Sequence, residues 1–364
     1  MKIVINCRLL NKRHGGPRRF LINMLTSLSE TDHVNDYVLI VDTKTSFIHN
    51  WPKNFKMINL NTKSRILYEY ITLPRYVNSI NADIFIVPDG TFSPLIKAKK
   101  ITIYHDIIYF EKNQKREFKF FDNLHHKIMI PICGKRTNLI ICVSRFTEER
   151  VHALLGFKNT KVIYEDVEDS FKSTSVSEQE KILDKYNIKK PFLFYIGSMS
   201  PRKNIERIIS SFDLIQYKIS HNLYFLGGYS WKDKHIMKII LSPKFKERVK
   251  KIGYISENDL SAIYSAAEAL VYPSLYEGFG LPIIEAQKCE CPVITSNIGA
   301  TREIAGDGAI LVDPFNTKSI SDGILCLIEN KDVRSELIQK GRKNLARFSW
   351  DNSVKKLVDM YYKI

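Results

Sequence analysis

The sequence lacks features that would place it in several other classes of protein. No run approaches the roughly 18 apolar residues of a membrane-spanning helix, and the opening MKIVINCRLL becomes charged too early for a secretory signal peptide. The six cysteines are scattered, with no pair at a zinc-like spacing, which indicates buried thiols rather than disulfides or a metal site. Asp-x-Asp, a motif with which some enzymes hold a metal, is also absent. We therefore predict a cytoplasmic protein that uses no metal.

The chain does have ample hydrophobic material and a large excess of positive charge. Its 364 residues are 44% hydrophobic, which is enough for roughly two domains with separate cores. The net charge of +16 is uneven, because residues 1–164 contain 26 lysines and arginines against 13 acidic residues. Such a basic half predicts an anionic partner: membrane lipid, a lipid diphosphate or nucleic acid. A lysine-rich, solvated surface would produce the same composition.

Short apolar runs alternate with helical or irregular segments, which predicts a doubly wound parallel sheet in each half of the chain. A polar, acidic stretch at Glu165–Glu180 is typical of a linker. We expect a first domain over residues 1–170, a second over 181–347 and a final helical segment over 348–364. The predicted strands are Lys2–Cys7, Tyr37–Asp42, Lys56–Leu60, Asp83–Val87, Ile101–His105 and Asn138–Val143, then Phe192–Ile196, Leu223–Leu226, Lys251–Tyr254, Ala269–Tyr272, Pro292–Thr295 and Ala309–Val312.

The segment between the strands at Ala269–Tyr272 and Pro292–Thr295 predicts an anion site. Gly278, Gly280 and Pro282 prevent one continuous helix, so we expect a glycine loop and then a helix that begins at Pro282. Such a helix start directs amide groups and the positive end of a dipole at one point. Glu277 in the loop and Glu285 in the first turn would flank the anion and accept hydrogen bonds from hydroxyl groups. A diphosphate between two sugars has this layout, although Glu285 could instead only complement the helix dipole.

A second anion site is predicted after the strand at Phe192–Ile196. Ser200 is a good helix cap and Pro201 a good first helical residue, which places Arg202 and Lys203 in a first turn. Cations oppose the helix dipole there unless an anion lies between them.

Two features of the first half suggest a ligand site and a surface. Gly15 and Gly16 join the first strand to a helix, and His105 ends the fifth strand, at the sheet edge where ligands collect. The segment Glu111–Lys135 mixes basic and apolar residues, as do segments that lie on anionic lipid, and as do ordinary helices with one buried face.

The stretch PSLYEGFGLPIIEA, in which Glu277 is followed by seven residues and Glu285, resembles the E-x7-E signature of retaining glycosyltransferases of family four. The resemblance continues through GYISENDLSAIYSAAEALVYPS, CPVITSNIGATREIAGDGAILVDP and ITIYHDIIYF. It implies the GT-B fold, with two Rossmann-like domains that face a cleft. The first domain would bind the acceptor, the second the nucleotide-sugar, and the last helix would cross back to the first.

The resemblance also implies roles for single residues. Lys203 would bind the diphosphate, with Arg202 in place of the arginine that relatives have where this chain has Ser198. Glu277 would accept hydrogen bonds from the donor sugar, Glu285 from the ribose, and His105 would face the donor sugar. Backbone groups would contact the base or phosphates at Gly15, Gly16, Tyr254, Gly278, Phe279, Gly280 and Leu281.

The resemblance is greatest to bacterial mannosyl- or glucosyltransferases that build O-antigen or capsule. We expect a hexose to move, with retention and without metal or cofactor, from GDP-mannose first or a UDP-sugar second. The acceptor would be a glycan or a lipid-diphosphate-linked glycan, and an anionic inner-leaflet membrane surface is a further expected partner. No nucleic acid is expected. The alternatives are a sugar-nucleotide epimerase of the same fold, a two-carboxylate hydrolase, and a non-catalytic nucleic-acid-binding protein.

Overall fold

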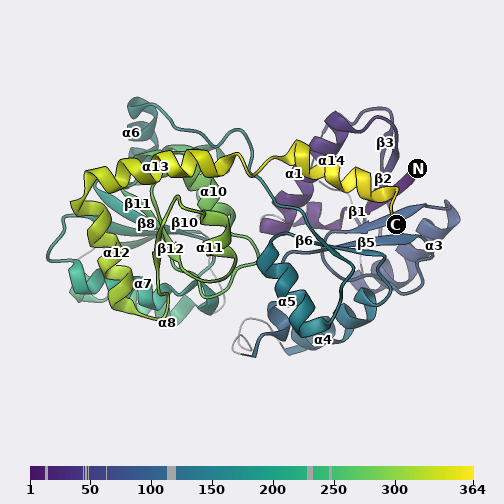
Figure 1. Ribbon diagram of the computed structural model, residues 1–364, viewed down its shortest axis with the longest axis horizontal. Coiled ribbons are helices and arrows are strands. Elements are labelled where there is room, and N and C mark those ends of the chain that lie inside the picture. The colour runs from purple at the N-terminus through teal and green to yellow at the C-terminus, as the bar shows by residue number, and fades with distance from the viewer. Residues whose placement is uncertain are drawn as a thin grey trace. The chain divides into compact units, whose positions relative to one another are not determined.

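The computed structural model describes residues 1–12, 15–43, 45, 47, 49–62, 64–112, 120–227, 233–245 and 248–364. These residues divide into two compact units (Figure 1). Unit 1 comprises Met1–Asp166 with Phe348–Ile364, and unit 2 comprises Val167–Arg347. Each unit is a parallel β-sheet covered by helices, which confirms the predicted α/β fold class.

The sheet of unit 1 has seven parallel strands among the described residues, in the order β3-β2-β1-β4-β5-β6-β7. The six predicted strands are found to within two residues at each end. The edge strand β7 was not predicted, because its sequence TKV contains a single apolar residue. The strands are β1 (Lys2–Asn6), β2 (Asp36–Val41), β3 (Phe55–Asn59), β4 (Ile84–Val87), β5 (Lys99–Tyr104), β6 (Leu139–Cys142) and β7 (Thr160–Val162).

Helices cover both faces of this sheet. The helical elements are η1 (Arg8–Asn11), α1 (Gly16–Thr31), α2 (Arg65–Leu67), the π-helical η2 (Tyr68–Thr72), α3 (Leu73–Ser79), η3 (Ile108–Phe110), α4 (Phe120–Gly134), α5 (Arg145–Leu155) and α14 (Trp350–Tyr361). On one face α1 and α14 pack together over β5 and β6 (Figure 1). On the other, Tyr104 and Cys142 of the sheet contact Ile130 of α4 and Val151 of α5.

The last helix is fixed to unit 1 by specific contacts. Ser349 caps α14, as predicted, by accepting a hydrogen bond from the amide of Asn352. The Trp350 indole donates to the carbonyl of Asp166 at 2.9 Å, and the Ser353 hydroxyl donates to the carbonyl of Tyr164 at 2.8 Å. The chain thus returns to unit 1 after it has built unit 2.

Unit 2 has six parallel strands among its described residues, in the order β10-β9-β8-β11-β12-β13. They are β8 (Phe192–Ile196), β9 (Asn222–Leu226), β10 (Val249–Gly253), β11 (Ala269–Tyr272), β12 (Val293–Ser296) and β13 (Ile310–Val312). The helical elements are α6 (Val176–Lys185), η5 (Pro201–Lys203), α7 (Ile205–Ile215), α8 (Asp233–Ile240), η6 (Pro243–Phe245), α9 (Glu257–Ala266), α10 (Leu281–Lys288), α11 (Gly299–Ala305), α12 (Thr317–Glu329) and α13 (Lys331–Leu345).

Three local predictions for unit 2 were wrong. Pro201 is the first residue of a helical turn with Ser200 before it, as predicted, but the turn is one 3₁₀ turn over Pro201–Lys203 that does not continue: Asn204 takes a left-handed conformation with φ of 64°, and α7 starts only at Ile205. The predicted linker ends in helix, since Ser175 caps α6. Glu285 lies in the second turn of α10, not in the first.

The cysteines are free thiols. Five are buried as predicted, but Cys326 in α12 is exposed. Within the described part of the chain, no three His, Cys, Asp or Glu side chains are grouped so as to hold a metal ion. No helix in this part is long and apolar enough to cross a bilayer.

The strand order reverses once in each sheet. In unit 1 the reversal lies between β1 and β4, and in unit 2 between β8 and β11. Ligands of doubly wound sheets bind beyond the carboxyl ends of the strands at this point. The loops that follow these four strands are therefore the candidate ligand-binding segments of the two units.

Candidate functional site

The loops after β8 and β11 in unit 2 are tied together by backbone groups. The amide of Leu275 donates to the carbonyl of Arg202 at 2.7 Å. The side-chain amide of Asn204 donates to the carbonyls of Pro273 at 2.9 Å and Pro314 at 2.7 Å. These bonds hold the Arg202–Lys203 turn against the residues that follow β11.

A buried ionic cluster forms where the two loops meet. The Glu277 carboxylate accepts hydrogen bonds from Arg202 Nη1 at 2.8 Å, from the Tyr272 hydroxyl at 2.9 Å and from Lys203 Nζ. Lys203 also donates to the Tyr272 hydroxyl at 2.8 Å. Lys203 and Glu277 are each only 7% exposed. The structure thus brings together three residues that the sequence had placed in two separate predicted sites.

The charges in this cluster do not cancel. Burial on its own would raise the pKa of the Glu277 carboxyl, but Lys203 and Arg202 outweigh burial and lower that pKa to about 2. Two cations and one carboxylate leave a formal charge of +1 in a largely buried place. The Glu277 carboxylate offsets part of the positive charge at positions 202 and 203, and the phosphate predicted there stays a prediction.

The start of α10 lies directly after this cluster in the chain. Gly280 precedes the helix with φ of 116°, a left-handed conformation that other residues rarely adopt. The first amides of a helix have no acceptor within it, so they can bind an anion. The first residues of α10, Leu281 and Pro282, thus lie close in the chain to the cluster of Arg202, Lys203 and Glu277, at the end of the helix whose dipole favours an anion.

Glu285 is buried behind the start of α10. Its exposed fraction is 2%, and it accepts a hydrogen bond of 2.5 Å from the Tyr264 hydroxyl of α9. Tyr264 was not predicted as a site residue, because in the sequence it looks like one more apolar residue of an amphipathic helix. The structure thus shows a tyrosine that orients the second carboxylate of the E-x7-E pair.

Further along this edge, a glycine lies at the end of each of three neighbouring strands or directly after it: Gly197 follows β8, Gly227 follows β9, and Gly253 ends β10. The amide of Gly197 donates to Leu226 at the end of β9, and the amide of Gly227 donates to Gly253 at the end of β10. A Cβ on Gly227 would collide with the backbone of Gly197, so the two loops approach as closely as backbone allows. Next to them lie the exposed residues Ser198 and Tyr254, the latter 60% exposed.

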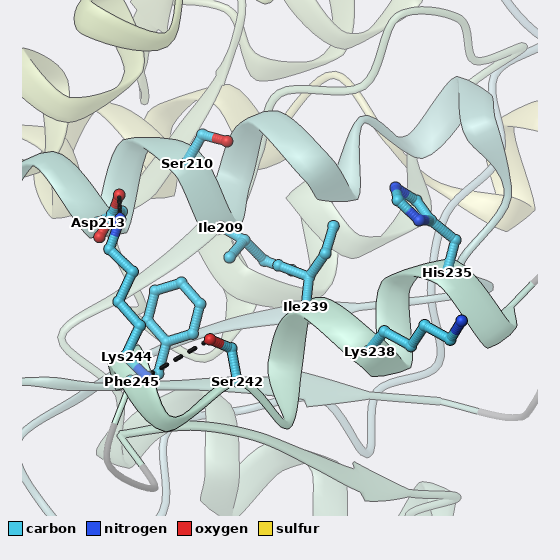
Figure 2. A pocket seen from close by; sticks show the side chains of 9 residues that line it. All are labelled: Ile209, Ser210, Asp213, His235, Lys238, Ile239, Ser242, Lys244 and Phe245. Atoms are coloured by element: carbon cyan, nitrogen blue, oxygen red, sulfur yellow. Dashed lines mark hydrogen bonds and ion pairs between the residues drawn. The ribbon is translucent and has the colours of Figure 1, made fainter.

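Two hollows lie beside these loops. One of about 300 Å³ is lined by the Met199–Pro201 turn, the start of α7, His235, Ile236 and Leu275. Figure 2 shows the other, of about 500 Å³, between α7 and α8, where Ile209 and Ile239 point toward each other and Phe245 closes one end. His235 lines both hollows, but no predicted site residue lines the hollow of Figure 2.

In unit 1 the predicted site residues lie beyond β1 and β5. Gly15 immediately precedes α1, and Gly16 is its first residue. A Cβ added at either glycine would meet no atom within 4 Å, so this helix start borders open space.

His105 follows β5 and is held from both sides. Its Nε2 lies 3.0 Å from the carbonyl oxygen of Pro88, and its Nδ1 lies 3.3 Å from Glu165 Oε1. The Phe20 ring meets the imidazole edge-on, with 4.8 Å between ring centroids. Both polar partners are acceptors when Glu165 is ionised, so both bonds form only when both ring nitrogens carry hydrogen. Glu165 is 3% exposed, and the sequence had placed it at the start of a linker.

Asp89 is a further carboxylate that the sequence prediction missed. It follows β4, at the reversal point of the sheet, and its buried Oδ1 has no hydrogen-bond partner among the described residues. Burial raises the pKa of the Asp89 carboxyl, although Lys12, Arg65 and Arg8 act in the opposite direction. The sequence Pro-Asp-Gly directly after an apolar strand was the signal that could have identified it.

The comparisons with known proteins agree with this architecture. Residues 178–344 match the family described as "Glycosyl transferases group 1". The solved structure of HepE from Anabaena, in complex with UDP and glucose, has a TM-score of 0.79 and 17% identity, with 100% of both chains covered. Residues 178–344 therefore form a group 1 glycosyltransferase domain, and the two parallel-sheet units have the fold of GT-B glycosyltransferases.

Two curated relatives make the similarity more specific. The O-antigen chain mannosyltransferase B of Escherichia coli is 28% identical over 72% of this chain and 70% of its own length. The O-antigen chain mannosyltransferase RfbU of Salmonella typhimurium is 25% identical over 96% of both chains.

Proposed function

We propose that this glycosyltransferase moves a hexose from a nucleotide-sugar to a glycan or lipid-diphosphate-linked acceptor of a surface polysaccharide, with retention at the anomeric carbon. The observation that carries the proposal is the cluster of Arg202, Lys203 and Glu277 beside the start of α10. Mannose from GDP-mannose is the first candidate, because both relatives named above are O-antigen chain mannosyltransferases. A UDP-sugar is the second candidate.

The cluster has the charge that a departing nucleoside diphosphate needs. In the proposed reaction the diphosphate takes a share of the hydrogen bonds that Arg202 and Lys203 now give to Glu277. Glu277 then accepts hydrogen bonds from hydroxyls of the donor sugar. Well-placed donors of this kind are worth about 3–4 kcal/mol each to a transition state in which negative charge develops. Side chains and helix amides, rather than a metal ion, are the proposed source of this stabilisation.

The bond changes balance without a protein nucleophile. The bond between the anomeric carbon and the diphosphate oxygen breaks, and the acceptor oxygen bonds to that carbon on the same face. The acceptor proton passes to the departing phosphate oxygen. Glu285, oriented by Tyr264, is assigned to the ribose of the nucleotide, and the backbone at Tyr254 to the base.

Unit 1 is assigned the remaining contacts of the reaction. Gly15 and Gly16 are proposed to contact the donor phosphate, and His105 a hydroxyl of the donor sugar. The acceptor is proposed to be bound by unit 1, whose first 164 residues hold most of the positive charge of the chain. A site of action at the anionic inner leaflet of a membrane would suit this charge.

The test uses the purified full-length chain with radiolabelled GDP-mannose, UDP-glucose and a UDP-N-acetylhexosamine, together with bacterial lipid extract as acceptor and with EDTA present. Transfer of one sugar to lipid, with the anomer of the product assigned by NMR, is the expected result. Lys203→Gln should weaken nucleoside diphosphate binding in calorimetry, while Lys244→Gln, a lysine 54% exposed beside the groove of Figure 2, should not. Equal binding by both variants would refute the proposed diphosphate site. Transfer that requires a metal would refute the proposed charge neutralisation.

A further inference from the structure

The helix α4 exposes four large apolar side chains. Phe120 is 72% exposed, Phe121 80%, Leu124 44% and Ile128 51%. Phe120 and Phe121 are adjacent, and Leu124 and Ile128 follow at spacings of three to four residues, which puts all four toward one side of the helix, while Ile130 packs into the core of unit 1 on the other side. A surface helix normally carries polar residues on its outward side, and a helix that is apolar all round is normally covered on all sides.

A second set of exposed apolar residues lies next to α4. In α2 and η2, Ile66 is 72% exposed, Leu67 45% and Ile71 41%. The hydroxyl of Tyr70 in η2 lies 3.0 Å from His125 Nε2 of α4, which places the two segments side by side. We refer to the seven exposed side chains as the α2–α4 patch: Ile66, Leu67, Ile71, Phe120, Phe121, Leu124 and Ile128.

Positive charge accompanies the patch. Lys127 lies on the outward side of α4, and Lys135 and Arg136 follow the helix, all exposed, while Asp122 is an exposed acid in its first turn. From residue 112 to residue 136 the sequence contains seven lysines and arginines and two acidic residues. Residues 113–119 of the predicted basic segment lie outside the described residues. A second copy of the same surface would repel this charge, whereas a layer of anionic headgroups over hydrocarbon would attract both the charge and the apolar side chains.

We propose that the α2–α4 patch docks unit 1 onto an anionic membrane surface. The aromatic and aliphatic side chains enter the boundary between headgroups and acyl chains, and the lysines and Arg136 contact the headgroup phosphates. This inference deepens the proposed function, since it names the surface that would bring the enzyme to a lipid-linked acceptor.

The test is flotation of the full-length protein with vesicles of phosphatidylcholine, with and without one part in four of phosphatidylglycerol. The wild type should float with the anionic vesicles and less so at high salt. The double variant Phe120→Ala/Phe121→Ala should lower the partition coefficient about tenfold or more, because two large apolar side chains are lost. Lys127→Glu should lower the partition coefficient about fivefold or more.

The matched control is Leu214→Ala/Tyr217→Ala. This variant removes side chains of α7 and of the turn after it that are 56% and 83% exposed, and it should float as the wild type does.

Folding and competing partners are checked in parallel. Because Phe120 and Phe121 are exposed, their double variant should keep the thermal unfolding temperature of the wild type. Failure of the wild type to bind anionic vesicles, or equal loss in the α7 control, overturns the proposal. The proposal is also overturned if the wild type sediments as a dimer and the Phe120→Ala/Phe121→Ala variant as a monomer, since a second copy would then cover the patch.

Hydrolysis of the nucleotide-sugar without vesicles should be unchanged in the double variant. Vesicle binding without any transfer would refute the proposed function and leave the docking surface standing.

Discussion

Replacing Glu277 by Gln tests the electrostatic account of the site. Gln keeps the size of the side chain and one acceptor oxygen but removes the negative charge between Arg202 and Lys203. In this respect Glu277→Gln resembles a wild type in which Glu277 is protonated. The variant should therefore lose the stability that the lowered pKa of this carboxyl represents.

The magnitude follows from the pKa itself. A fall from 4.5 to about 2 corresponds to about 3 kcal/mol of stability at neutral pH. For a unit of this size, that should lower the melting temperature by about 6–12 °C. Because the folded state lowers the pKa of an acid, the contribution is complete above the unfolded value of 4.5 and is lost as the pH falls from there through 2.

The assay is urea unfolding of wild type and Glu277→Gln, followed by far-UV circular dichroism at neutral pH and again at about pH 3. The control is Glu290→Gln, since Glu290 pairs with Arg342 at 2.5 Å with 36% and 58% of the two side chains exposed. Such exposed pairs contribute about 0–1 kcal/mol. The difference in stability between the two proteins should be largest at neutral pH and roughly halved at about pH 3, because the folded-state pKa of about 2 lies below that pH. Equal stability at neutral pH, or a difference that does not change with pH, would show that Glu277 is not held ionised by its neighbours.

Three further substitutions test the other carboxylates. Glu165→Gln should lower kcat about tenfold or more with little change in the donor KM, because Glu165 orients His105; a lower melting temperature with unchanged kcat would assign Glu165 a structural role only. Tyr264→Phe should cost about 1.5–3 kcal/mol in urea unfolding, since it removes a hydrogen bond to the buried, charged Glu285, and a loss well below 1 kcal/mol would contradict this. Asp89→Asn should raise the melting temperature at neutral pH: burial raises the pKa of the Asp89 carboxyl, so stability is lost as the pH rises above the unfolded value of 3.8, and the loss is complete above the raised value. A lower melting temperature at neutral pH would falsify this account of Asp89.

The strands were predictable because each is a short, apolar run that is buried on both faces of a parallel sheet. The edge strand β7 was not, since an edge position requires little apolar surface. The end of the Pro201–Lys203 turn at Asn204 was not predicted either. Local preferences favoured a helix start, but Asn204 is held in a left-handed conformation by two carbonyls that come from distant parts of the sequence.

The candidate site likewise contains some residues that the sequence predicted and others that it did not. Glycines, charged residues after strands and the spacing of Glu277 and Glu285 are local signals, and the predicted site residues were chosen from them. The partners Tyr264, Tyr272 and Glu165 were missed, because a tyrosine in an apolar run and a glutamate in a polar stretch look ordinary until the fold supplies their neighbours. The ion pairs of Glu277 were missed for the same reason, since its partners lie 74 and 75 residues away in the chain.

The carboxylate of Glu277 acts as an internal counter-ion, and this raises the binding free energy that any other anion needs in order to occupy the site. Any anion that approaches Lys203 and Arg202 must compete with the Glu277 carboxylate, which is covalently part of the chain and is always present beside them. A lone inorganic phosphate offers little beyond its charge. A nucleotide-linked sugar brings base, ribose and sugar contacts as well, and its hydroxyls give Glu277 new partners in exchange for those it gives up. If the proposed diphosphate site is correct, small anions alone should bind it weakly.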